Sequence, residues 1–339
     1  NKCQNNMKQL GLAIQNFSDT YNHLPNSFRP NSTVRISWIT RSLPFMEQGA
    51  LADKFDLAKN WNDSTADTAN GYKIPNAILA MSRIESLECP SSPSPNKRFD
   101  ADPDTTGPYP TTDTLAVVAA SGTSFTTTGL FCAPTDYSPT TFVDQRLDSA
   151  GTPNDNKADV AHIAAQNANK NGPADGLLPK DYDGNNKPRF SDATDGLSNT
   201  IAIAESAGRP WVYRMGKRAD DSTGSFPTRR VNGGGWVRPA SDFAFDGSSR
   251  DGTTFGTGSN VTKAINSTNG ESNETAAFGS APYGKEGGGE PYAFHPAGIN
   301  VTLGDGSVKF ITEGVTIRVF SSLVTRGGSE TIDRKSAGL

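Results

Sequence analysis

The chain has 339 residues, which is enough to bury a sizeable hydrophobic core without help from cross-links or metals. Hydrophobic residues make up 34% of it, and 34 Gly and 22 Pro predict many turns and long connections, which argues against a helical bundle. The 32 basic and 36 acidic residues give a net charge of -4, which offers no general attraction to nucleic acid or an anionic membrane. No stretch approaches the roughly 20 apolar residues of a membrane-spanning helix.

The first predicted element is an amphipathic helix over residues 1–23. Its apolar residues recur at alternating three- and four-residue steps and therefore share one face: Met7, Leu10, Ile14, Phe17 and Tyr21. Leu24-Pro25 should end the helix, because a residue before Pro is driven out of the α region. Gly11 should cost this helix about 1 kcal/mol relative to Ala. Since residue 1 is Asn, we expect an upstream segment that carries a targeting signal.

A second, shorter helix is predicted over residues 43–55, with Pro44 near its start and Phe55 as its last apolar position. Beyond residue 70 the pattern changes to short runs of strand-forming residues at 115–118, 200–205, 211–214, 235–238, 299–303 and 307–311. Turn-rich connections separate these runs, so we expect an antiparallel sheet. Asp305-Gly306 supplies a tight hairpin turn between the last two runs.

Three connections are longer than ordinary loops: residues 91–113, 133–198 and 240–292. They are rich in Gly, Pro, Ser, Thr, Asn and Asp, a composition typical of surface excursions. None reads as a clean linker between domains. We therefore expect one head with long loops.

The residues that could bind zinc are the three histidines and the three cysteines: His23, His162, His295, Cys3, Cys89 and Cys132. Zinc needs several such ligands to converge, and these residues are dispersed, without C-x-x-C spacing. The spacing therefore argues against a zinc site.

Asp181, Asp183 and Asn185 are a candidate calcium site. Their oxygen-bearing side chains occupy every second position, with the turn-forming Gly184 between the last two. The spacing of an EF-hand loop and its terminal Glu are absent. Asp, Asn and Gly also simply favour turns, so the segment predicts either a bound cation or a turn.

His295 could act as a general base oriented by Asp305, which would indicate hydrolysis or proton transfer. A strand over residues 299–303 would separate the two by roughly 17 Å, at about 3.3 Å per residue. We therefore expect Asp305 and Gly306 to form the turn and His295 to cap a neighbouring loop. On this reasoning the chain has no catalytic residue and is not an enzyme.

Several of these segments together carry a family resemblance. Residues 3–13 and 16–17 resemble the segment that follows the membrane helix in a large bacterial family of pilin-like proteins, domain of unknown function 1559. The likeness continues in the family's order through residues 37–38, 43–48, 89–91, 192–200 and Glu205. Near the end, His295, Asp305 and Gly306 reproduce the His-x9-Asp-Gly signature from which many members take their name.

Members of that family resemble prepilins, which have a basic leader, a cleavage and N-methylation site, an apolar helix and a β-rich head. The resemblance therefore implies an α+β fold of the type IV pilin or pseudopilin kind, with a long N-terminal helix packed on a mostly antiparallel β head. Residues 1–24 would be the C-terminal half of that helix, with its apolar half upstream. Residues 25–339 would form the head. The face of Met7, Leu10, Ile14, Phe17 and Tyr21 would pack on the head or on other subunits.

The resemblance also implies a function. The chain would be a structural subunit of a pilus, a filament or a type II secretion-type assembly, outside the cytoplasm at the cell surface or in the periplasm. Its partners would be copies of itself or other pilin-like subunits, the inner membrane through the upstream helix, and an extracellular glycan or secreted substrate; nucleic acid is not expected. The alternatives are an envelope-anchored module that binds a polysaccharide or solute and, less favoured, a hydrolase using His295.

A disulfide is a further implication of the resemblance. Ser267 stands where many relatives carry Cys, so a disulfide at that position is impossible here. The resemblance suggests pairing Cys3 with Cys89, which leaves Cys132 unpaired.

Overall fold

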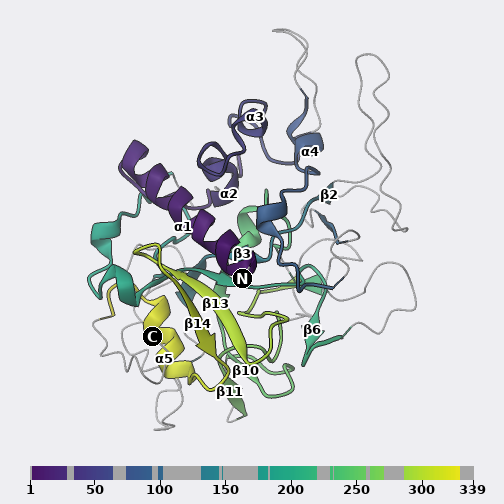
Figure 1. The fold of residues 1–339 in the computed structure, drawn as a ribbon. Coiled ribbons are helices and arrows are strands. Elements are labelled where there is room, and N and C mark those ends of the chain that lie inside the picture. Colours follow the sequence, from purple (N-terminus) through teal and green to yellow (C-terminus); the bar gives the residue numbers. More distant parts are fainter. Residues whose placement is uncertain are drawn as a thin grey trace.

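The computed structural model describes residues 2–28, 34–63, 74–93, 98–101, 131–144, 147, 175–181, 184–219, 230–231, 233–256, 260–270 and 286–328. The predicted run at 115–118 lies outside these ranges. Within them the fold combines helices with a mostly antiparallel sheet (Figure 1). Among the described residues, no helix combines the length and apolar character needed to cross a bilayer.

The central sheet has four strands in the order β14-β13-β5-β3, and every neighbouring pair is antiparallel. The strands are β3 (Tyr137–Ser138), β5 (Ile201–Glu205), β13 (Gly298–Leu303) and β14 (Val308–Thr312). Three of the predicted runs therefore form strands of one sheet. All six residues of β13 are buried, because both of its faces are covered.

The predicted N-terminal helix is α1 (Lys2–Tyr21), and it covers one face of the sheet (Figure 1). Met7, Leu10, Ile14 and Phe17 are buried, as their spacing predicts. Tyr21 is the exception at 52% exposed, because it lies in the last turn, where its ring packs only against neighbouring rings such as those of Phe17 and Phe45. Four of the five residues of the predicted face, from Met7 to Phe17, therefore face the head.

Gly11 lies where α1 crosses the sheet. A Cβ atom added there would come 2.8 Å from Thr302 Cγ2 and 3.4 Å from the Cα atom of Gly306. In the same crossing the Thr302 hydroxyl donates a hydrogen bond of 3.1 Å to the Met7 carbonyl. The glycine that weakens the isolated helix thus permits its close approach to β13.

The opposite face of the sheet is covered by α5 (Ile317–Val324), whose N-terminus is capped by the Thr316 hydroxyl accepting from the Val319 N–H. Phe320 is fully buried, and its ring lies 4.7 Å from that of Phe245. This layer also holds two strands that pair in parallel, β4 (Thr140–Val143) and β9 (Phe243–Phe245). The sheet is thus enclosed by two helical layers, both formed by long-range packing.

Two of the predicted elements are wrong. Residues 43–55 do not form one helix but follow α2 (Trp38–Ser42) as the short turns η1 (Leu43–Phe45) and α3 (Gly49–Ala52). The break falls at Glu47, whose φ of 58° lies in the left-handed region and cannot continue a helix. Residues 235–238 contain only an isolated bridge between Gly235 and Pro134, followed by η7 (Pro239–Ser241). The predicted run at 211–214 shortens to β6 (Tyr213–Arg214).

The remaining described elements are short and lie in the connections around the sheet. They are α4 (Asn76–Leu79), η2 (Glu85–Leu87), β1 (Asp100–Ala101), β2 (Phe131–Cys132), η5 (Phe190–Asp192), η6 (Leu197–Asn199), β7 (Lys217–Arg218), β8 (Arg230–Val231), β10 (Ser248–Ser249), β11 (Val261–Lys263) and β12 (Glu286–Gly287). Of these, β8 pairs with β12 in parallel, whereas β1 with β2, β6 with β7 and β10 with β11 are antiparallel.

Candidate functional site

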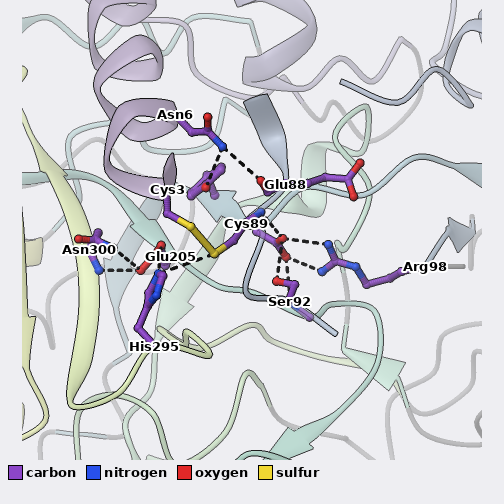
Figure 2. Close-up of a disulfide and its surroundings, with 12 residues drawn as sticks. Cys3, Asn6, Glu88, Cys89, Ser92, Arg98, Glu205, His295 and Asn300 are labelled. Atoms are coloured by element: carbon purple, nitrogen blue, oxygen red, sulfur yellow. Dashed lines mark hydrogen bonds and ion pairs between the residues drawn. A yellow bond between two sulfur atoms is a disulfide. The ribbon is translucent and has the colours of Figure 1, made fainter. Parts of the chain in front are cut away.

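A disulfide joins the first turn of α1 to the segment that follows η2. It links Cys3 and Cys89, the pair suggested by the family resemblance, across 86 residues of sequence with their Cα atoms 5.4 Å apart (Figure 2). Both cysteines are buried, at 4% and 0% exposure. Outside the disulfide, Lys2 at the start of α1 and Glu85 in η2 form an exposed ion pair. The disulfide therefore fixes the start of α1 on the head.

A histidine and a carboxylate lie against this disulfide. The Nε2 atom of His295 is 3.7 Å from Cys89 Sγ and 3.0 Å from Glu205 Oε1 (Figure 2). Glu205, the last residue of β5, is fully buried, and its other oxygen accepts hydrogen bonds from the Asn300 backbone N–H at 2.7 Å and side-chain amide at 3.1 Å. The hydrogen bond to Glu205 raises the pKa of His295, although burial opposes this shift.

Cys3, Cys89, Glu205 and His295, here called the cysteine–histidine cluster, bring four different ligand atoms together. The two sulfurs, a carboxylate oxygen and an imidazole nitrogen all lie within 4.8 Å of one another. They come from α1, the segment after η2, the end of β5 and the loop before β13. The dispersed sequence positions gave no sign of this convergence, because it depends entirely on long-range packing.

Behind Cys89 lies a buried ion pair between Arg98 and Asp136, both fully buried. One Asp136 oxygen accepts from the Cys89 backbone N–H at 2.7 Å and the Ser92 hydroxyl at 2.9 Å, and the other accepts from the Gly208 N–H at 2.9 Å. Burial alone would raise the pKa of Asp136, but Arg98 and these amides outweigh it and hold the pKa below its usual value. The charged carboxylate thus anchors the backbone of Cys89.

The polar part of α1 joins the same region. The side-chain amide of Asn6 donates to the Glu88 carbonyl at 3.2 Å (Figure 2). It also donates to the Tyr137 hydroxyl at 3.2 Å. Burial raises the pKa of Tyr137, so its hydroxyl stays protonated. Hydrogen-bonded polar groups therefore border the cluster, in addition to apolar packing.

A cleft of about 550 Å³ adjoins the cluster at His295, whose side chain is 20% exposed. Its wall includes the edge-to-face rings of Tyr292 and Phe294, with centroids 5.2 Å apart, and the charged residues Arg250 and Lys263. The remaining lining residues are Met215, Gly216, Ile265, Asn266, Ser267, Ala293, Pro296 and Glu313. His295 thus lies between the cleft, which it lines, and the buried Cys89 sulfur.

The other two signature residues lie at the opposite end of β13 from His295. Asp305 Oδ1 accepts from the Ser307 N–H at 2.9 Å, and Gly306 has a φ of 81°, as a hairpin turn requires. A Cβ atom at Gly306 would come 2.6 Å from Gln15 Nε2 of α1. His295 was expected to cap a neighbouring loop, and its Nε2 atom instead faces the buried carboxylate of Glu205 at the end of strand β5.

At the candidate calcium segment, the Asp181 carboxylate is used within the turn. Its Oδ1 accepts from the backbone N–H groups of Gly184 at 2.8 Å and Asn186 at 3.3 Å, and the residue is 3% exposed. Asn185 is exposed, and Asp183 lies outside the described residues. Calcium binding here stays a prediction.

Comparison with known proteins identifies a family. A family model described as "Protein of unknown function (DUF1559)" matches residues 1–317. No curated protein and no solved structure matches the chain. The matched range contains the whole sheet, α1 and every residue of the cysteine–histidine cluster.

Proposed function

Because the chain belongs to the DUF1559 family of proteins of unknown function, we propose that it is the head of a pilin-like structural subunit, built into a pilus, a filament or a type II secretion-type assembly. Its partners in that assembly are copies of itself or other pilin-like subunits. Before assembly, an upstream apolar helix anchors it in the inner membrane, with the head outside the cytoplasm.

The observation that carries this proposal is the position of α1 on the antiparallel sheet. One face of α1 is buried in the head, whereas Gln4, Lys8 and Leu12 on its outer face are exposed. Lys2, at its start, is also exposed, so an apolar helix continuing upstream would leave the head without displacing its core. Such a helix would pack against those of neighbouring subunits by close contact of apolar side chains.

The disulfide supports the proposed location. Disulfides persist in oxidising compartments such as the periplasm and the cell surface, and are rare in the cytoplasm. The Cys3–Cys89 bond also holds α1 on the head, which a subunit pulled by its N-terminal helix requires. An oxidising compartment would thus maintain the bond that fixes α1 to the head.

The N-terminus of the protein isolated from its native envelope tests this proposal. We expect an N-methylated residue that opens an apolar helix continuous with α1, identified by intact mass and N-terminal peptide sequencing. Sheared surface filaments from the same cells should contain the chain. A lipidated cysteine or a signal-peptidase end, with no chain in the sheared fraction, would contradict assembly.

The cleft beside His295 favours a second function, an envelope module that binds a saccharide or solute. Aromatic rings and the cationic side chains of Arg250 and Lys263 suit a sugar that carries an acidic group. Titration with neutral and uronic-acid oligosaccharides should show binding that Phe294→Ala and Lys263→Ala weaken. If uronic-acid oligosaccharides bind no more tightly than neutral ones, and neither variant weakens their binding, this function is excluded.

We propose no enzymatic role for His295. Its Nε2 atom already faces Glu205 and the disulfide, so that nitrogen is not presented to a substrate in the cleft. A panel of glycosidase, esterase and peptidase substrates should show no turnover above background. Turnover that His295→Gln abolishes in a folded protein would establish the hydrolase instead.

A further inference from the structure

The cysteine–histidine cluster has the composition of a metal site. Thiolate sulfur, imidazole nitrogen and carboxylate oxygen are the ligands that zinc takes in proteins, and four of them make a closed tetrahedral site. In the described part of the chain, Cys3, Cys89, Glu205 and His295 form the one group of histidine, cysteine and acidic residues able to surround a metal ion. This inference does not rest on the proposed structural function.

The geometry suits a tetrahedral ion. Zinc bonds of about 2.3 Å to sulfur and 2.0–2.2 Å to nitrogen or oxygen place neighbouring ligand atoms roughly 3.3–3.8 Å apart. His295 Nε2 lies 3.7 Å from Cys89 Sγ and 3.0 Å from Glu205 Oε1, and no pair of the four atoms exceeds 4.8 Å. The main change required is separation of the two sulfurs, which are bonded to each other in the disulfide.

The surrounding contacts orient these ligands. The Asn300 hydrogen bonds hold Glu205 Oε2, which leaves Oε1 directed toward His295 and the disulfide (Figure 2). The Cys89 backbone is held by buried Asp136. Such supporting hydrogen bonds are typical of metal ligands, whose orientation they fix.

Reduction adds two thiols beside the buried Glu205 carboxylate. In the oxidised protein His295 and the two Asn300 hydrogen bonds are the partners of that carboxylate. Buried thiolates next to it would be costly without a further positive charge. A divalent cation among the four side chains would offset two of the three negative charges.

We propose that, once the Cys3–Cys89 disulfide is reduced, Cys3, Cys89, Glu205 and His295 bind one Zn²⁺ ion, so that disulfide and metal are alternative states of one site. A dithiol supplies the two electrons and two protons that convert the disulfide to two thiols, and is itself oxidised to a disulfide. Zinc then displaces the two thiol protons to solvent, with no further redox change. The proton that His295 Nε2 shares with Glu205 also leaves that nitrogen, to solvent from a charged ring or to Nδ1 from a neutral one, so that Nε2 can bind the ion. His295 is the member of the cluster that lines the cleft, so the site meets solvent on that side.

Cobalt titration of the full chain tests this proposal. The protein is reduced with a phosphine, desalted without oxygen and titrated with Co²⁺, whose thiolate charge-transfer and tetrahedral ligand-field bands report the ligands. We expect one Co²⁺ per chain, displaced by one Zn²⁺, and no such bands in the oxidised protein. Reduced protein that binds less than one equivalent, or oxidised protein that gives the same bands, would overturn the proposal.

Variants identify the ligands. Asn300→Ala, which removes only a side chain that orients Glu205, should weaken Zn²⁺ binding by about 10- to 100-fold. His295→Gln and Glu205→Gln, which remove a ligand atom, should each weaken it more than Asn300→Ala does. His23→Gln and Cys132→Ala are matched controls that should leave affinity unchanged. Unchanged affinity in His295→Gln, or loss in Cys132→Ala, would assign the metal elsewhere and contradict the proposal.

A second readout does not need any variant to fold. Alkylation of the reduced wild-type protein, followed by peptide mass mapping over time, should show that one equivalent of Zn²⁺ slows the modification of Cys3 and Cys89. The rate at buried Cys132 should be the same with and without Zn²⁺. Unchanged alkylation rates of Cys3 and Cys89 on adding Zn²⁺ would overturn the proposal.

Discussion

The two faces of the central sheet differ in what they bury. Toward α5, β13 presents Ile299, Val301 and Leu303, and their partners in that core are apolar. Toward α1, alternate residues of the same strand are the polar Asn300 and Thr302, which bond to Glu205 and to the backbone of α1. The α5 face depends on apolar packing, whereas the α1 face also depends on hydrogen bonds between specific side chains. The candidate site, with Glu205, His295 and the disulfide, accordingly lies on the α1 face.

The largest expected effect comes from the apolar face. Phe320→Ala should lower the free energy of unfolding by about 3–5 kcal/mol, because it leaves a cavity among fully buried side chains. Urea unfolding measures this loss, which should be similar in oxidised and reduced protein because α5 does not contact the disulfide. Val319→Ala, half-buried on the same helix, is the control with a smaller loss. A Phe320→Ala effect below that of Val319→Ala would refute close packing on this face.

The α1 face should instead depend on redox state. Reduction opens a loop spanning a sequence separation of 86 and should remove about 2–4 kcal/mol from the free energy of unfolding, since the unfolded chain regains freedom. Chemical unfolding with and without reductant, in a chelating buffer, gives the difference. The Cys132→Ala variant should show the same redox difference in the free energy of unfolding. The double variant Cys3→Ser, Cys89→Ser should show no redox difference. Redox dependence in the double variant would contradict the assignment.

Gly11 tests how closely α1 approaches β13. Gly11→Ala should lower the free energy of unfolding by about 1–3 kcal/mol, because its Cβ would meet Thr302 Cγ2, even though Ala favours helix by about 1 kcal/mol. Thr302→Ser removes that methyl group and keeps the hydroxyl, so Gly11→Ala should cost less in its background. Gly49→Ala in α3, where a Cβ meets nothing within 4 Å, is the control and should cost little. Equal costs for Gly11→Ala in both backgrounds would place the conflict elsewhere.

The smallest effect is a pH dependence from His295. Its pKa is raised in the folded oxidised protein by Glu205, so the protonated pair stabilises the fold at pH values below about 6.5, the ordinary histidine pKa. This contribution, less than about 1 kcal/mol for a partly exposed pair, is lost as pH rises through the raised pKa. The stability difference between wild type and His295→Gln across pH measures it, with His23→Gln as control. A difference that grows with rising pH would have the wrong sign.

Local patterns in the sequence were enough for α1 and for the β13–β14 hairpin. Three- and four-residue spacing identified the buried face of α1 up to Phe17, and Asp305-Gly306 marked the turn, because both features depend on neighbours along the chain. The family resemblance is confirmed by the match over residues 1–317. The predicted helix at 43–55 failed because the backbone of Glu47 adopts a left-handed conformation that its residue type does not indicate.

Only the tertiary structure decided the rest. It placed Gly11 against Thr302 and turned an apparent helix defect into a crossing point. It also carried Glu205 and His295 to the two cysteines, whereas the sequence spacing had argued against zinc. The sequence by itself determined the family, the first helix, the hairpin and the residues that share a local face, because these follow from short-range periodicity and turn chemistry. Which distant side chains meet is set by how the helices and loops pack on the sheet, and that packing has no local signature.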